Sequence, residues 1–325
     1  MTHLHLSYNN SSISNIESLS KCLGVPEKVL IEVAEKRDSY YKENEPEIKS
    51  NGKKRITYSL DKRLKIIQKK IKVKIFNSVY YPDYLQGSIK DKLNPRTYEK
   101  NAAIHAGAKL IISEDVSNFF PSIDEKIVCE MWKYLFGFSV EVSKLLTKLT
   151  TYKGSVPQGG VTSSYISNLI MWDLEPALVM KLDSMGLTYT RYIDDVTISS
   201  RLQWIPKEKI EISIKSIYAM LKAKGVNPNR TKHQIMGGDN KMVIHNLNVN
   251  SGRPTLNKVK RQKIRLEVFN LKKLSIVCNK RGKKYEELFK SVNGKVLELC
   301  KFHPSQGEKY LDELNSIRPI ITEIY

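Results

Sequence analysis

The chain has 325 residues, 41% of them hydrophobic, enough for two or three compact subdomains. No stretch of about 18 apolar residues occurs and the N-terminus is polar, so we expect neither a membrane span nor a signal peptide. The four cysteines are scattered without a Cys-x-x-Cys spacing, which argues against a zinc site or a disulfide framework and favours a cytoplasmic protein.

Most of the net charge of +20 lies in two blocks of the chain. Residues 51–110 carry 15 basic and 4 acidic side chains, and residues 251–325 carry 17 and 8. Residues 1–50 and 111–250 are nearly neutral, with net charges of −2 and +2. Such blocks can hold a polyanion such as nucleic acid by neutralising its phosphates. The alternative is an ordinary solvated lysine surface.

The N-terminal region is predicted to be helical. In residues 12–41, Gly24 and Pro26 separate two short helical patterns, so we expect residues 1–50 to form an N-terminal helical extension. Residues 63–81 have apolar side chains at helical spacing and a lysine-rich opposite face.

The centre of the chain alternates strand and helix patterns. The run "KLIIS" (109–113) predicts a buried strand that ends at Asp115. Residues 159–186 predict one long helix, opened by Thr and Ser caps and closed near Gly186. Residues 188–192 and 196–200 predict two strands, with Ile193, Asp194 and Asp195 at or near their turn.

The remaining elements are mostly helical. Residues 206–225 predict an amphipathic helix that ends at Gly225, and residues 241–257 predict a hairpin. Residues 257–325 predict basic helices. The pattern therefore indicates an α+β protein with one small sheet.

Two adjacent acids at a hairpin need a positive counterpart. Arg191 nearby supplies one charge, and the strand ending at Asp115 could bring a third carboxylate to the same edge. Hard divalent cations with oxygen ligands fit three clustered carboxylates, and Mg²⁺ leaves positions for substrate phosphates. Two metal ions about 3.5–4 Å apart could then bind both oxygens of an in-line phosphoryl displacement.

Five segments together resemble the motifs of reverse transcriptases, in the same order and with similar gaps. They are "SEDVSNFFPSI" (113–123), "SVPQGGVTSSYISN" (155–168), "YIDD" (192–195), "GVNPNRTKHQ" (225–234) and "MVIHNLNV" (242–249). The resemblance implies a right-hand polymerase. Its fingers and palm would occupy residues 51–250, with palm strands at about 108–124 and 186–250 in a small antiparallel sheet. A basic helical thumb would occupy residues 251–325.

The resemblance also implies roles for individual residues. Asp115, Asp194 and Asp195 match the acids that bind two Mg²⁺ ions, and the backbone carbonyl of Val116 would be a further ligand. Lys232 matches the lysine that protonates the pyrophosphate leaving group.

Four further residues match nucleotide-binding positions. Phe120 matches the aromatic residue that leaves no room for a ribose 2′-OH, although a core phenylalanine is the alternative. Gln158 matches the glutamine beside the incoming deoxynucleotide, and Gly159 allows close backbone approach. Arg55 lies where the fingers hold the triphosphate.

Among reverse transcriptases, the chain resembles the bacterial retron enzymes. "NAAIH" (101–105), "FFP" (119–121) and the basic C-terminal region carry this likeness, whereas residues 244–246, Ile-His-Asn, replace the usual Val-Thr-Gly. Six residues would contact RNA: Asn101, His105, His245, Lys260, Arg261 and Arg265. For His105, a buried structural histidine is the alternative.

A retron enzyme is expected to bind its cognate structured noncoding RNA and to prime from the 2′-OH of a guanosine in that RNA. It would use dNTPs to make a branched RNA–DNA molecule, and it would act with an accessory effector protein against phage. Two alternatives stay open: another bacterial reverse transcriptase, of the abortive-infection or group II intron type, and a non-catalytic RNA-binding scaffold.

Overall fold

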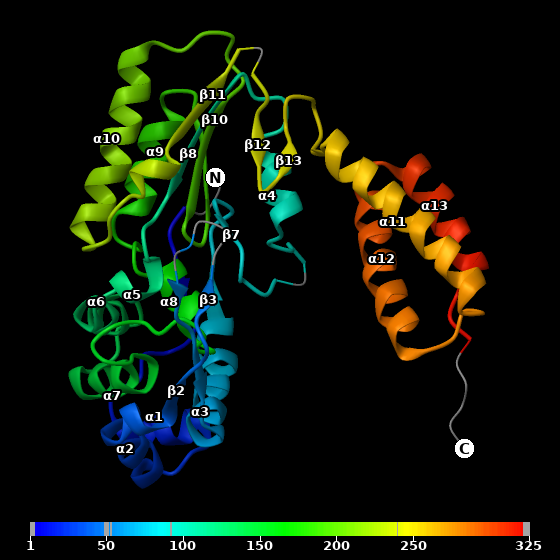
Figure 1. Cartoon of the computed structure of the whole chain (residues 1–325). Coiled ribbons are helices and arrows are strands. Elements are labelled where there is room, and N and C mark those ends of the chain that lie inside the picture. Colours follow the sequence, from blue (N-terminus) through cyan, green and yellow to red (C-terminus); the bar gives the residue numbers. More distant parts are fainter. Residues whose placement is uncertain (1–3, 49–51, 53, 92, 239, 321–325) are drawn as a thin grey trace. The chain divides into compact units, whose positions relative to one another are not determined.

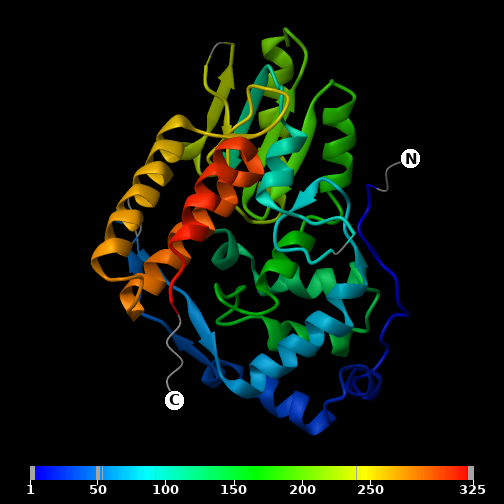
Figure 2. The ribbon, with the colours of Figure 1, turned by 90° about the vertical axis from the view of Figure 1, so that its right-hand side faces the viewer.

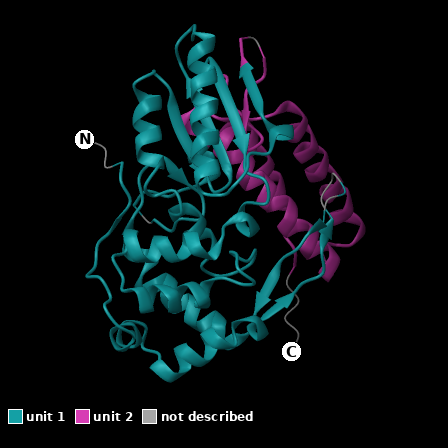
Figure 3. Ribbon diagram, turned by 90° about the vertical axis from the view of Figure 1, so that its left-hand side faces the viewer, with its two compact units in different colours: residues 1–101, 109–236 teal, residues 102–108, 237–325 magenta. Residues whose placement is uncertain are grey.

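A computed structural model describes residues 4–48, 52, 54–91, 93–238 and 240–320. The chain divides into two compact units, which Figure 3 distinguishes by colour. Unit 1 comprises residues 1–101 and 109–236, and unit 2 comprises residues 102–108 and 237–325. The division into fingers, palm and thumb stays a prediction.

The centre of unit 1 is a five-stranded sheet with the order β11-β8-β10-β9-β7 (Figure 1). The strands are β7 (Leu85–Gln86), β8 (Leu110–Asp115), β9 (Thr188–Tyr192), β10 (Asp195–Ser200) and β11 (Gln234–Gly237). The predicted strand ending at Asp115 and the predicted hairpin are confirmed. β10 pairs antiparallel with β8 and β9, but β7 adds a parallel edge that the sequence did not indicate.

Helices pack against this sheet, and its central strands β8, β9 and β10 are buried nearly throughout instead of alternating, whereas the edge strand β11 is exposed or partly exposed. α9 (Glu175–Asp183) packs against β9, and α10 (Lys207–Ala223) packs against α9 (Figure 1). Ile112 and Ile198, opposite each other in β8 and β10, are inaccessible to solvent. The amphipathic helix predicted before Gly225 is confirmed as α10.

The prediction of one long helix over residues 159–186 is wrong, because the segment forms α8 (Ser163–Leu169) and then α9. Pro176 in the first turn of α9 has no backbone N–H, and its ring excludes a helical carbonyl four residues earlier. The expected cap is also absent, since Thr162 makes no capping hydrogen bond.

The first fifty residues are built into unit 1. α1 (Ile16–Leu23) and α2 (Glu27–Glu35) confirm the two predicted N-terminal helices, and β2 (Tyr41–Glu43) pairs with β5 (Tyr58–Leu60). α3 (Lys62–Lys74) confirms the helix expected from residue 63, although it is shorter than predicted and packs against α1 and α7 (Val140–Thr150). The other described elements up to residue 236 are β1 (Ser7–Tyr8), β3 (Glu47–Ile48), β4 (Lys54–Arg55), β6 (Val79–Tyr80), α4 (Tyr98–Ile104), α5 (Phe119–Ser122), α6 (Glu125–Glu130), a π-helical turn (Met131–Leu135) and three 3₁₀ turns (Arg37–Tyr40, Phe76–Ser78, Arg230–Lys232).

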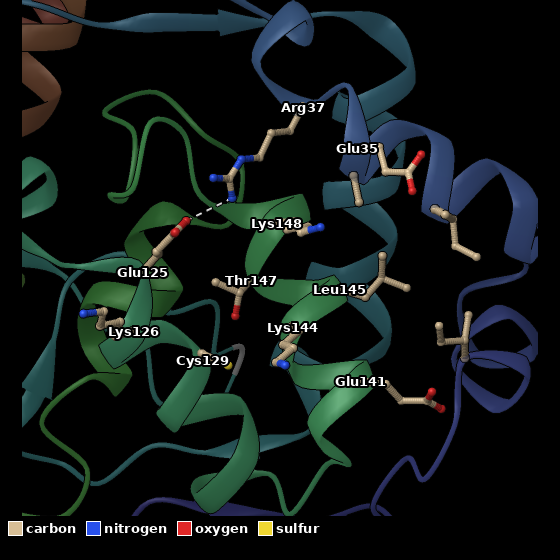
Figure 4. Close-up of a pocket in the computed structure, with 13 residues that line it drawn as sticks. Glu35, Arg37, Glu125, Lys126, Cys129, Glu141, Lys144, Leu145, Thr147 and Lys148 are labelled. Carbon is tan, nitrogen blue, oxygen red and sulfur yellow. Dashed lines mark hydrogen bonds and ion pairs between the residues drawn. The ribbon is translucent and has the colours of Figure 1, made fainter.

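A pocket of about 590 Å³ lies among α1, α2, α6 and α7 (Figure 4). Ile31 and Leu145 are among the apolar residues that line it, and the lining residues Arg37 and Glu125 form an ion pair of 3.0 Å. The lining residues include none of those assigned from the sequence to chemistry.

Unit 2 contains a three-stranded sheet and three helices. Its strands are β12 (Val243–Ile244), β13 (Leu247–Asn248) and β14 (Thr255–Leu256), so the predicted hairpin is confirmed and gains a third strand. The helices are α11 (Lys258–Val277), α12 (Lys283–Phe302) and α13 (Pro304–Ser316), as the sequence predicted. Within the described part of the chain, every helix is too short or too polar to cross a lipid bilayer.

Candidate active site

The β9–β10 turn brings two acids to the end of β8. Ile193 has a positive φ of 61°, which is strained for a β-branched side chain. The backbone carbonyl of Asp194 accepts a hydrogen bond from the N–H of Val116 at 3.1 Å. Asp195 stands directly opposite Asp115 in the strand register. The prediction that Asp115 lies beside the hairpin is therefore confirmed.

Burial and mutual repulsion act on these carboxyl groups. Burial raises the pKa of Asp194, and the Asp115 carboxylate raises it further against the charges of Lys232 and Arg55. Burial, Asp194 and Asp115 together raise the pKa of Asp195 to about 7, and Lys232 opposes them. The three carboxyl groups together thus carry more negative charge than the neighbouring bases stabilise.

Lys232 partly compensates this charge at Asp115. Its Nζ lies 2.6 Å from Oδ2 of Asp115, and Nδ2 of Asn229 donates to Oδ1 at 3.0 Å. The backbone N–H of Asn229 also donates to the Asp115 carbonyl at 2.6 Å. The 3₁₀ turn that carries Lys232 is therefore fixed to the end of β8. Sequence reasoning missed Asn229.

The donor set suits a hard divalent cation, since it offers carboxylate oxygens from neighbouring strand ends. Over the ranges that the structure describes, however, no three His, Cys, Asp or Glu side chains are placed to hold one metal ion. The predicted ligand roles therefore stay predictions.

A second polar cluster lies behind the acids. Glu114 is buried, and its carboxylate contacts Nδ1 of His233 at 2.6 Å and accepts from the Tyr218 hydroxyl at 3.1 Å. Because side chains alternate along a strand, Glu114 points away from Asp115. His233 follows Lys232 directly, so this contact helps to position the turn that carries the lysine.

Arg191 does not act as the expected counter-charge of the acids. It is fully buried, and its Nε and Nη2 donate to the two oxygens of Glu175 at 2.6 and 2.7 Å. Arg191 pairs with Val196 and therefore points to the opposite face of the hairpin from Asp195. Its Nη1 donates to the Ile193 carbonyl at 3.1 Å, so it supports the turn from the core side.

The segment with Pro-Gln-Gly contacts residues of the first basic block. The Gln158 side-chain oxygen, oriented toward Arg55, accepts from its Nε and Nη2 at 2.8 and 2.6 Å. Gly159 has a φ of 114°, and a Cβ there would lie 2.2 Å from the Tyr58 carbonyl oxygen. The close approach that requires glycine is therefore to the protein's own backbone. Gln68, which the sequence did not single out, accepts from the Val161 N–H at 2.9 Å.

Phe119 and Phe120 differ in exposure. Phe119 is 2% exposed and belongs to the core, whereas Phe120 is only partly buried. The spacing from Asp115 pointed to Phe120, and its exposure leaves part of its ring available to a ligand.

The residues predicted to contact RNA fall into two groups. Asn101 and His105 are fully buried and are not accessible to RNA in this structure, which favours the structural alternative for His105. Four lie in unit 2. Lys260 pairs with Glu298 at 2.7 Å, Arg261 contacts Gln306 at 3.4 Å, Arg265 is exposed, and His245 lies with a positive φ in the β12–β13 turn.

The raised pKa of Asp195 predicts a pH-dependent stability. Because the folded protein holds this proton more tightly than the unfolded chain, folding stability is lost as the pH rises from about 4 to about 7. We expect Asp195→Asn to stabilise the metal-free protein by about 1 to 3 kcal/mol at pH 8, at about 1.36 kcal/mol per pKa unit. Urea unfolding in EDTA measures the difference, which should fall to about a third of that value at pH 5, because only part of the window between about pH 4 and about pH 7 has then been crossed. An equal difference at both values would contradict the assignment.

Comparison with known proteins defines the class. The family model "Reverse transcriptase (RNA-dependent DNA polymerase)" matches residues 42–288, which is most of the chain. The chain therefore belongs to the reverse transcriptases, the RNA-directed DNA polymerases with an α+β right-hand fold.

Within that family it belongs to the bacterial retron reverse transcriptases. It is 35% identical to the retron Se72 reverse transcriptase of Salmonella heidelberg (strain 579083-10), over 96% of this chain and 82% of the relative. It is 30% identical to the retron Ec48 reverse transcriptase of Escherichia coli, over 97% and 78%.

Among solved structures, apo telomerase from Candida tropicalis is similar, with a TM-score of 0.44 and 11% identity, over 78% of this chain and 47% of that one. Telomerase from Candida albicans with a fragment of telomeric RNA has a TM-score of 0.43 and 10% identity, over 68% and 48%. The chain thus spans about half the length of these proteins, and such low TM-scores support no further conclusion.

Proposed function

We propose that this reverse transcriptase makes a branched RNA–DNA molecule, multicopy single-stranded DNA, from a cognate structured noncoding RNA. It starts synthesis from a 2′-OH of that RNA, uses dNTPs and copies part of the same RNA. It works in the cytoplasm with an accessory effector protein in defence against phage. The observation that carries this proposal is the similarity to two retron enzymes over nearly the whole chain.

The proposed chemistry is metal-assisted nucleotidyl transfer. Asp115, Asp194, Asp195 and the Val116 carbonyl would hold two Mg²⁺ ions, whose chemistry would be charge stabilisation of the attacking and leaving oxygens. Lys232, which is 2.6 Å from the Asp115 carboxylate, would donate a proton to the leaving pyrophosphate.

The nucleotide is held by the fingers and the Pro-Gln-Gly segment. Arg55 is exposed and carries the charge that a triphosphate needs, and its contact with Gln158 places both beside the same loop. Gly159 keeps the loop against the Tyr58 backbone. Arg265, exposed on α11, and His245 remain the best candidates for RNA contacts in unit 2.

Phe120 gives a test of sugar selection. If its ring occupies the volume of a 2′-OH, Phe120→Ala should raise ribonucleotide incorporation by about tenfold or more, which corresponds to at least about 1.4 kcal/mol. Single-nucleotide extension with dNTP and rNTP measures this ratio. Phe119→Leu, a change in the buried neighbour, is the control and should leave the ratio unchanged. An unaltered ratio in Phe120→Ala would remove its role in selection.

The product itself tests the retron proposal. Protein purified from its native host should carry one predominant RNA joined to DNA through a 2′–5′ linkage. Sequencing after treatment with a debranching nuclease identifies both strands. Linear DNA on heterogeneous RNA would instead indicate another type of reverse transcriptase. Bound RNA without any DNA synthesis would indicate a scaffold.

A further inference from the structure

The outer face of α3 is basic and carries no assigned function. Five of its bases are exposed: Lys62, Arg63, Lys65, Lys69 and Lys74. Between Asp61 and Asp83 the sequence has no acidic residue. α3 lies along one side of unit 1, in light blue in Figures 1 and 2. None of the residues assigned to catalysis, nucleotide binding or RNA binding is on this helix.

Part of the charge on α3 is placed unfavourably for an isolated helix. Asp61 caps its N-terminus and accepts from the Arg63 N–H at 2.8 Å, but the first turn itself holds Lys62 and Arg63 and no acid. Lys65 and Lys69 are four residues apart, a spacing at which like charges repel. Over the described ranges of the chain, no base of α3 forms an ion pair with an acidic side chain.

Other exposed helices of unit 1 are built differently. Lys21 in α1 pairs with Glu17 at 2.6 Å, and Lys207 in α10 lies 4.0 Å from Glu211. Both pairs have the i,i+4 spacing that stabilises a solvated helix. α1 and α10 thus each carry an acid that pairs with one of their lysines, whereas α3 has none.

Apolar side chains lie among these bases. Ile66 is 44% exposed and Val73 is 56% exposed, and both fall at helical spacing with Lys62 and Lys69. The face therefore offers exposed bases over about 18 Å, from Lys62 to Lys74 at 1.5 Å per residue, with small apolar side chains between them. Over that length a duplex presents several phosphates.

The inner face of α3 is hydrogen-bonded to the Pro-Gln-Gly segment. Gln68 is fully buried, accepts from Val161 N–H at 2.9 Å and donates to the Leu149 carbonyl at 2.9 Å. The outer face therefore has a fixed position relative to Gln158, so a ligand held there would be held at a constant distance from the loop.

We infer that the outer face of α3 binds the phosphate backbone of a double-stranded stem of RNA. A-form RNA is recognised mainly through its shape and backbone, which suits a row of unpaired lysines. That this RNA is the enzyme's own structured RNA rests on the proposed function. An acidic protein surface is the competing partner.

The test replaces three exposed lysines of α3 in Lys62→Gln/Lys65→Gln/Lys69→Gln. A matched control, Lys207→Gln/Lys215→Gln/Lys222→Gln, removes the same charge from exposed positions of α10. The probe is a labelled RNA duplex of about 20 base pairs, titrated at roughly 50 to 200 mM KCl. Extension of a short DNA primer on an RNA template and the melting temperature are measured on the same proteins.

We expect the α3 variant to bind the duplex about tenfold more weakly, with a salt slope smaller by about 2 to 3, since each lost phosphate contact lowers it by about 0.9. Primer extension and the melting temperature should stay at the wild-type values, and the α10 variant should bind like wild type. Equal affinity and slope in the two variants would overturn the inference and leave an acidic protein as the partner to test. Wild-type protein that binds the duplex but does not extend the primer would instead contradict the proposed function.

Discussion

Asp194→Asn is expected to lower the rate of DNA synthesis by about 10³-fold or more, which corresponds to about 4 kcal/mol of transition-state stabilisation. Asp194 lies in the turn beside the end of β8, and its backbone carbonyl accepts a hydrogen bond from the Val116 N–H. Asparagine preserves the size of the side chain but removes the charge that a metal ligand needs. Single-turnover extension of a DNA primer on an RNA template, with Mg²⁺ present, measures the loss.

RNA binding should stay within about twofold of wild type in this variant, because phosphate contacts by basic residues dominate such affinity. Asp183→Asn is the matched control, since Asp183 is exposed at the end of α9 and its loss should not affect synthesis. Synthesis at the wild-type rate in Asp194→Asn would defeat the assignment of the catalytic acids.

Arg191→Met is expected to destabilise the protein by about 3 to 5 kcal/mol. The guanidinium and the Glu175 carboxylate are both fully buried, and the Tyr189 hydroxyl also donates to Glu175 at 2.7 Å. Removing the arginine leaves a carboxylate without its counter-charge in the core. Urea unfolding at pH 7 measures the change in the free energy of unfolding.

Two further variants separate the ion pair from packing. Arg191→Met/Glu175→Met removes both charges and should be less destabilised than Arg191→Met alone. Lys21→Met breaks an exposed, solvent-screened pair and should leave the urea midpoint close to that of wild type. A loss below about 1 kcal/mol in Arg191→Met would show that the buried pair contributes little.

Arg191 also predicts a kinetic effect. Its Nη1 donates to the Ile193 carbonyl while its Nε donates to Glu175. The single ammonium group of a lysine cannot make both contacts in this geometry. At a temperature where it is folded, Arg191→Lys should therefore lower kcat and change KM little. A kcat equal to that of wild type would mean that the turn keeps its position without the guanidinium.

Local patterns in the sequence were enough to predict most of the elements around the site. The apolar run before Asp115, the paired strands around Asp194 and the amphipathic helix before Gly225 all formed as expected. These signals are local, because strand and helix periods depend on neighbouring residues. The break between α8 and α9 also had a local signal, which is Pro176. The prediction of one long helix followed the helical pattern on both sides of this proline instead.

The contacts that orient the site were beyond such reasoning. Lys232 meets Asp115 across 117 positions of the chain, and Gln68 meets Val161 across 93. The strand register places Arg191 and Asp195 on opposite faces of the hairpin, and which face is buried depends on how α8 and α9 pack. Tertiary packing therefore places Arg191 in the core and not beside the acids, where it was expected. A buried guanidinium needs several hydrogen-bond acceptors, and for Arg191 these come from α8 and α9.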